Sequence, residues 1–157
     1  MNNKHLTKII IIGTAGNGIR FMARKFLELL SAHDKKLYIT YYFGYDSTVR
    51  GGNTIAYITI AKDKEPNGYI FNDCDILLTF RENKLKKFKA KKYIGRVYKR
   101  GNHIEFEELS SKHFKNPIHA NMIALGYLAH ILNIKNAKLS LDPTNTKAFN
   151  LGFNLAK

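Results

Sequence analysis

Three glycines follow a run of four isoleucines near the start of the chain. Residues 9–18 read IIIIGTAGNG, and apolar residues at helical spacing begin at Ile19. Glycines let a backbone turn tightly, and the free N–H groups at the start of a helix can bind an anion or a carbonyl oxygen. The stretch therefore has the residue types and spacing of a strand–loop–helix unit that binds phosphate.

This loop lacks the residues that complete a nucleotide site. Gly13, Gly16 and Gly18 stand in the order G-x-x-G-x-G rather than G-x-G-x-x-G, and no acid ends the next expected strand to bind a ribose. The sequence G-K-[ST] is also missing, and Arg20 is misplaced for its phosphate-binding lysine. The pattern thus gives little support to an NAD or ATP site. The glycines mark a contact surface or serve close packing of the strand against the helix.

A second glycine-containing loop, GYDSTVRGGN at residues 44–53, lies between two expected strands. No hairpin rule requires an arginine before two glycines, as found in Arg50, Gly51 and Gly52. The two glycines allow a positive φ or the close approach of another backbone. Because both loops lie at sheet ends, we expect Arg50 to project beside the first loop. The alternative is a plain connecting loop with a solvated arginine.

The spacing of apolar residues predicts the elements that carry these loops. One α/β domain over residues 1–157 is expected, with helices covering a sheet. The sheet should be mixed, because two strands follow each other without an intervening helix. Strands are expected at Lys8–Ile12, Leu37–Tyr42, Thr54–Ile60, Asp75–Phe80 and around Lys92–Tyr98. Helices are expected at Ile19–Ser31, in the basic stretch before Lys92, at Pro117–Asn133 and through Ala148–Leu155.

Composition excludes several classes of protein. No apolar run approaches the roughly 18 residues of a membrane span, and we recognise no targeting segment, so cytoplasm is the expected compartment. The single cysteine, Cys74, can form no internal disulfide and cannot hold an iron–sulfur cluster, which takes about four thiolates. The six histidines show no H-x-x-x-H or H-E-x-x-H spacing, so no metal site is expected.

The chain is strongly basic, with a net charge of +14. Residues 81–100 hold ten Lys/Arg and one acid, Glu82, and interleave apolar residues with the lysines. Such a stretch could track the phosphates of a nucleic acid. It could also be a solvated face or a surface that docks an acidic subunit, because charge alone indicates that a protein associates with something and not which reaction it performs. We favour the second interpretation.

Taken together, these segments resemble the gamma subunit, or gamma domain, of the 2-oxoacid:ferredoxin oxidoreductases. Members carry G-x-G-G-Q-G after the first strand, here GTAGNG at residues 13–18, and S-Y-G-x-E-x-R-G-G, here GYDSTVRGG at residues 44–52. A strand like DILLTF, the helix motif N-M-x-x-L-G at residues 121–126 and a closing KAFNLGF follow in order. The sequence departs from the family pattern at Ala15, Asn17, Asp46 and Thr48.

The resemblance implies a single three-layer, Rossmann-like α/β domain with a mixed, largely parallel sheet. In this family thiamine diphosphate, magnesium and the iron–sulfur clusters belong to alpha, beta and delta chains, with coenzyme A as co-substrate. The chain would be the gamma subunit of a complex that converts a 2-oxoacid to acyl-CoA and passes electrons to ferredoxin. It would hold no cofactor itself, and the isolated chain is expected to be inactive.

The same resemblance implies which residues face the assembled active site or coenzyme A. These are the two glycine loops: Gly16, Asn17, Gly18, Arg50, Gly51 and Gly52. No catalytic residue and no metal ligand is expected in this chain, and neither a membrane nor nucleic acid is the expected partner. The alternative function is a stand-alone basic protein that binds nucleic acid or an anionic ligand through residues 81–100.

Overall fold

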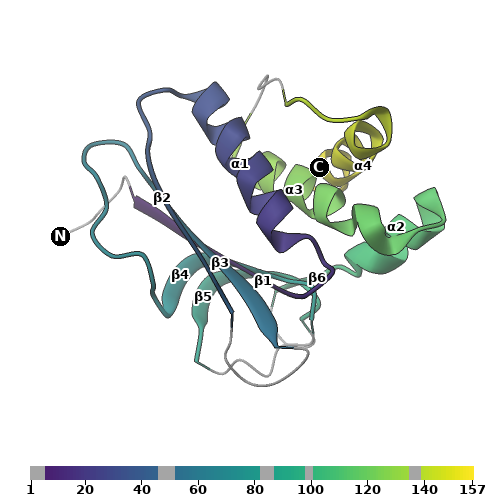
Figure 1. Ribbon diagram of the computed structural model, residues 1–157, viewed down its shortest axis with the longest axis horizontal. Helices are drawn as coiled ribbons and strands as arrows, with labels where there is room; N and C mark the ends of the chain where they lie inside the picture. The colour runs from purple at the N-terminus through teal and green to yellow at the C-terminus, as the bar shows by residue number, and fades with distance from the viewer. Residues whose placement is uncertain (1–5, 46–51, 82–86, 98–100, 135–138) are drawn as a thin grey trace. The chain divides into compact units, whose positions relative to one another are not determined.

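The computed structural model describes residues 6–45, 52–81, 87–97, 101–134 and 139–157 (Figure 1). The chain divides into two compact units, one formed by residues 1–15 and 36–104 and the other by residues 16–35 and 105–157. The first holds the described strands and the second the described helices. A single domain over residues 1–157 stays a prediction.

The sheet unit contains six strands in the order β2-β3-β1-β4-β5-β6. Strands β1 and β3, and β2 and β3, pair antiparallel, whereas the three remaining neighbour pairs are parallel. The α/β class and the mixed, largely parallel sheet are therefore confirmed. The strands are β1 (Leu6–Thr14), β2 (Tyr38–Tyr45), β3 (Asn53–Ala61), β4 (Asp73–Thr79), β5 (Lys89–Gly95) and β6 (Asn102–His103).

The isoleucine run forms the centre of this sheet. Ile9 to Ile12 are all at most 1% exposed, as expected for a central strand that is apolar without alternation. On one face of the sheet, Ile10 and Ile12 cluster with Tyr57, Leu77 and further apolar residues. Burial of these β-branched side chains fixes β1 between β3 and β4, so the first glycine loop starts from a rigid strand, and the second ends at β3, the neighbour of β1.

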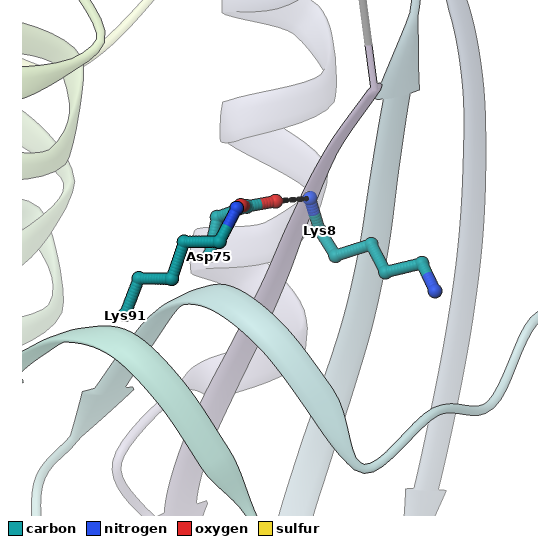
Figure 2. Close-up of polar contacts among 3 residues, drawn as sticks. All are labelled: Lys8, Asp75 and Lys91. Atoms are coloured by element: carbon teal, nitrogen blue, oxygen red, sulfur yellow. Dashed lines mark hydrogen bonds and ion pairs between the residues drawn. The ribbon is translucent and has the colours of Figure 1, made fainter. Parts of the chain in front are cut away.

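Asp75 completes the hydrogen bonding at the start of the β1–β4 pair. Its Oδ2 accepts from the backbone N–H of Lys8 at 2.8 Å, and its Oδ1 lies 2.6 Å from the Nζ of Lys91 (Figure 2). The regular β1–β4 register begins only at Ile9↔Ile76, so the carboxylate satisfies an N–H beyond that register. The Lys91 side chain is 82% exposed, which limits what its ion pair contributes.

Replacing Asp75 with alanine is expected to lower the free energy of unfolding by about 1–2 kcal/mol, because the partly buried N–H of Lys8 loses its acceptor. The Asp75→Asn variant keeps an acceptor oxygen and should lose less. The matched control is Lys91→Gln, which removes only an exposed ion pair and should leave stability nearly unchanged. Urea unfolding measures the stability of all three variants. Equal losses of stability for Asp75→Ala and Lys91→Gln would show that the ion pair, and not the hydrogen bond to Lys8, accounts for the effect of Asp75→Ala.

The helical unit contains four described α-helices and one 3₁₀ turn. The helices are α1 (Ile19–His33), α2 (Phe106–Phe114), α3 (Ala120–Ile131) and α4 (Pro143–Leu155), and the turn η1 is Pro117–His119. Helix α3 is buried nearly all round and packs along α4 (Figure 1). The two helices approach closely at Gly126 and Gly152, where an added Cβ would lie 1.9 Å from the carbonyl oxygen of Phe149 and 1.8 Å from that of Ile123, respectively.

The expected elements differ from the observed ones in a few places. The helix expected at Pro117–Asn133 is divided, because Asn116 caps a 3₁₀ turn before α3 begins. Helix α4 runs through the expected Ala148–Leu155 stretch and begins at Pro143, the pair Asp142-Pro143 having been expected to open this segment, because Asp142 supplies an N-cap and proline suits the first helical position. Helix α2 and the short β6 were not anticipated. Most of the expected basic helix lies outside the described residues, and β5 begins at Lys89, earlier than expected.

Asp142 should make the stability of α4 depend on acid pH. The backbone N–H groups of Asn145 and Thr144 each donate to its Oδ1 at 3.0 Å, and these bonds, led by that of Asn145, lower its pKa below the ordinary 3.8. A lowered folded-state pKa gives stability that is present above 3.8 and is lost as the pH falls through the folded pKa. The Asp142→Asn variant keeps a cap that does not titrate. The difference between its melting temperature and that of the unmodified chain should therefore become smaller as the pH is lowered from 7 to 3. A difference in melting temperature that stays constant with pH would contradict the lowered pKa of Asp142.

In the part of the chain that the structure describes, no helix combines the length and the apolar character needed to cross a membrane.

Candidate functional site

The first glycine loop joins the end of β1 to the start of α1. Gly16 has φ +98° and Gly18 has φ +67°, and both values favour glycine. Gly18 is the N-cap of α1 and its carbonyl accepts from the N–H of Met22 at 2.9 Å, while no side chain caps the helix. Gly13, in contrast, is a strand residue of β1 that pairs with Thr54. The three glycines therefore have different roles.

Asn121 of α3 holds the loop at Gly18. Its Nδ2 lies 3.5 Å from the carbonyl oxygen of Gly18, and a Cβ added at Gly18 would come within 2.4 Å of the same nitrogen. Close packing against Asn121 thus explains why a glycine stands at position 18, whereas a Cβ at Gly16 would meet nothing within 4 Å. Asn121 opens the N-M-x-x-L-G motif, and Gly126 at its end admits α4. The motif therefore fixes the glycine loop at one end and the α3–α4 contact at the other.

Asn17 points its amide at a carboxylate from α2. Its Nδ2 donates to Oε1 of Glu107 at 2.8 Å. The two residues line an open depression of about 160 Å³, together with Gly16, Ala120 and residues 116–118. The carboxylate brings negative charge to the loop that precedes α1, which makes this loop a poor phosphate site. The depression offers oxygen acceptors and is suited to an amide, hydroxyl or ammonium donor.

Glu107 is the residue that sequence reasoning missed. Its helix carries a usable signal, because Phe106, Leu109, Ser110 and Phe114 recur at helical spacing. Acidic residues occupy the first turn of α2 and basic residues the last turn, as the helix dipole favours. The pairing of Glu107 with Asn17, 90 residues away, could not be found from spacing.

The second glycine loop follows β2 and rejoins the sheet beside the end of β1. Thr14, the last residue of β1, pairs with Asn53, the first residue of β3. Gly52 precedes Asn53, so it lies at the same end of the sheet as Ala15. Arg50 and Gly51 lie outside the described residues, as do Asp46 and Thr48. That Arg50 projects beside the first loop stays a prediction.

The basic segment is divided in the described residues. Lys89, Lys91 and Lys92 belong to β5, whereas Arg81 and Arg96 follow the carboxyl ends of β4 and β5. Residues 82–86 and 98–100 lie outside the description. Three of these cations thus lie within β5, Arg81 and Arg96 follow the same ends of two neighbouring parallel strands, and Lys91 is paired with Asp75.

Cys74 offers no reactive thiolate. Burial raises the pKa of its thiol to about 12, and the carboxylates of Asp75 and Asp73 act in the same direction against the opposing charge of Lys8. Among the described residues, no group of three or more His, Cys, Asp or Glu side chains could hold a metal ion.

Comparison with known families identifies one family model that spans nearly the whole chain. The model described as pyruvate ferredoxin/flavodoxin oxidoreductase matches residues 8–154. A curated relative, the 2-oxoglutarate synthase subunit KorC of Archaeoglobus fulgidus, is 27% identical over 167 residues, which cover 95% of this chain and 87% of the relative. Both matched stretches include the two glycine loops.

Solved structures share the fold. The gamma subunit of a keto/oxoacid ferredoxin oxidoreductase from Geobacter sulfurreducens superimposes with a TM-score of 0.69 at 17% identity, covering 96% of both chains. Subunit PORC of pyruvate oxidoreductase from Thermotoga maritima gives 0.67 at 15% identity, covering 98% of this chain and 96% of that one. The 2-oxoglutarate:ferredoxin oxidoreductase from Magnetococcus marinus, with 2-oxoglutarate, coenzyme A and succinyl-CoA bound, gives 0.73 at 19% identity. This chain, 98% of it covered, spans 31% of the Magnetococcus chain.

Proposed function

The chain belongs to the pyruvate ferredoxin/flavodoxin oxidoreductase family, and from this premise we propose that it is the gamma subunit of a thiamine diphosphate-dependent 2-oxoacid:ferredoxin oxidoreductase. The complex would convert a 2-oxoacid and coenzyme A to acyl-CoA and carbon dioxide and reduce ferredoxin. The observation that carries the proposal is the family match over residues 8–154. The gamma-subunit structures of similar fold add support.

The chemistry would take place on groups held by alpha, beta and delta chains. Thiamine diphosphate supplies carbanion stabilisation after decarboxylation, and the clusters carry the electrons. With one cysteine in its sequence, this chain has too few thiolates for a cluster, which takes about four. This chain would help to position the reacting groups and would contribute charged and polar side chains around them, and by itself it would turn over no substrate.

The two glycine loops are the part of the chain proposed to face the active site. Asn17, held by Glu107, would present a fixed polar surface to a donor group of a partner chain or of coenzyme A. Gly16 would let the backbone of a partner chain approach closely, and Gly18 would keep the loop packed against Asn121. In the second loop, Arg50 would meet the phosphates of coenzyme A or an acidic partner residue, with Gly51 and Gly52 giving it room.

Purification of the tagged chain from its native cell tests the proposal. The expected eluate contains larger chains with thiamine- and cluster-binding motifs, identified by mass spectrometry, and has the brown absorption of iron–sulfur clusters. It should reduce a viologen dye with a 2-oxoacid and coenzyme A, and the separated chain should not. A colourless eluate that contains only this chain, or this chain with RNA, would refute the proposal and favour the basic-protein alternative.

In the purified complex, Arg50→Ala is expected to lower kcat/KM for coenzyme A by about tenfold, because one charge-assisted contact to a phosphate is lost. The matched control is Lys64→Ala, which removes an exposed cation of the sheet unit away from both glycine loops. Steady-state kinetics with varied coenzyme A distinguishes the two variants. Equal kinetics for Arg50→Ala and the unmodified complex would remove Arg50 from the site.

A further inference from the structure

The sheet unit exposes large apolar side chains on β2 and in the segment that leads from β3 to β4. Tyr38 and Tyr42 alternate along β2 and so lie on the same face. The ring of Tyr42 lies 6.2 Å from that of Tyr57, which in turn lies 5.4 Å from the ring of Phe71. Tyr69 and Ile70 directly precede Phe71 in the chain. We call the four exposed residues the tyrosine face: Tyr38 (46% exposed), Tyr42 (43%), Tyr69 (54%) and Ile70 (61%).

The rings beneath the tyrosine face are already packed and covered. Tyr57 meets Phe71 at an interplanar angle of 81° and Phe88 at 62°, both edge-to-face arrangements. The ammonium group of Lys8 lies 5.2 Å from the centre of the Phe71 ring, and that of Lys87 lies 5.1 Å from the centre of the Phe88 ring. The surface thus combines exposed tyrosine and isoleucine with cations at its margin.

Charge restricts what such a surface can bind. The residues of the sheet unit, 1–15 and 36–104, include sixteen Lys/Arg and six Asp/Glu, a net charge of +10 out of the +14 of the whole chain. A second copy of this chain would bring the same positive charge and would be repelled. A partner with an apolar centre and carboxylates around it would be attracted both by the tyrosines and by the lysines.

We propose that the tyrosine face docks an acidic-rimmed surface of another subunit of the complex. The proposal rests on the gamma-subunit function proposed above, and it names the surface and the chemistry of its partner. Tyrosine is among the residues that dominate binding energy at protein interfaces, since it buries a large rigid area and still offers a hydroxyl. Side chains with half of their surface exposed in the single chain would then be covered in the complex.

A nucleic acid fits this surface less well than a protein does. Stacking of bases requires open ring faces, and of the rings in this surface Tyr42 already packs against Tyr57, while those of Phe71 and Phe88 each have a lysine ammonium group over them. Ile70, the most exposed of the four, has no aromatic face for a base.

The test compares three tagged chains purified from the native cell under the same conditions. They are the unmodified chain, the double variant Tyr69→Ser/Ile70→Ser and the control Leu155→Ser, which removes an exposed apolar side chain from the end of α4. Circular dichroism first checks that all three have the same melting temperature. The dissociation constant is then measured with the partner chains separated from the unmodified complex, at low and high salt.

The expected result is binding that is about tenfold to a hundredfold weaker for the double variant, unchanged for Leu155→Ser, and weaker for all three at high salt. Hydroxyl-radical footprinting of the complex should also show protection of Tyr38 and Tyr42. Equal affinity of the double variant and the unmodified chain, or unprotected tyrosines, would overturn the proposal alone. If the double variant loses an acidic partner that the unmodified chain binds, and that partner lacks thiamine and cluster motifs, only the proposed oxidoreductase function would be overturned. Retention of RNA, or of no partner at all, would overturn both.

Discussion

Gly126→Ala is expected to lower the free energy of unfolding by about 3 kcal/mol. The added Cβ would lie 1.9 Å from the carbonyl oxygen of Phe149 and 2.8 Å from the backbone nitrogen of Phe153. Both are backbone atoms, so no side-chain rotation can relieve the contact, and α3 and α4 must move apart. Helix propensity alone predicts the opposite sign, a gain of about 1 kcal/mol for alanine over glycine. The sign of the change therefore decides between packing and propensity.

Urea unfolding followed by circular dichroism measures this effect. Gly152→Ala is the symmetric test, because its Cβ would lie 1.8 Å from the carbonyl oxygen of Ile123 on the facing helix. The control is Asn154→Ala, an exposed position on α4 that gains helix propensity without a new contact. We expect the two glycine variants to be destabilised and the control to be slightly stabilised. Stabilisation of Gly126→Ala would show that the two helices do not approach as described.

In the purified complex, Gly18→Ala is expected to reduce turnover by about tenfold or more while the chain still folds. An L-residue at φ +67° costs about 1–2 kcal/mol. In addition, the new Cβ would come within 2.4 Å of the Asn121 side chain, which would have to rotate away from the carbonyl oxygen of Gly18. The loop would then lose its link to α3, and the Asn17 amide next to it would be displaced.

Gly16→Ala separates the two causes, because Gly16 also has a positive φ but a Cβ there meets nothing within 4 Å. The double variant Gly18→Ala/Asn121→Ala relieves the clash with the added Cβ, but it keeps the backbone strain and also lacks the link between the loop and α3. Turnover should fall most for Gly18→Ala, with melting temperatures close to one another for Gly16→Ala and Gly18→Ala. If both single variants lose the same turnover, strain alone explains the result and Asn121 has no part in positioning the loop.

Local pattern was sufficient for most of the fold. The uninterrupted Ile9–Ile12 run and the helical spacing from Ile19 each report burial that local sequence encodes, and the structure has a strand and a helix at these places. The TIAYITI stretch also forms a strand, β3, although its residues are buried along nearly the whole strand rather than alternately. Adjacent strands without a helix between them also predicted the mixed sheet. The motifs pointed to the gamma-type family by their order along the chain, and the family match confirms that resemblance. Helix α2 was missed although its spacing is regular, because it is short and weakly apolar.

Long-range pairing, in contrast, was decided only by the tertiary structure. Asn17 and Glu107 are 90 residues apart, and Gly18 and Asn121 are 103 apart, so no periodicity connects them. A sequence pattern tells which side of an element is apolar, but which residue meets it depends on how the elements pack. The first glycine loop therefore had the composition of a phosphate site in the sequence, but in the folded chain it is hydrogen-bonded to a carboxylate from α2, whose negative charge disfavours a phosphate there.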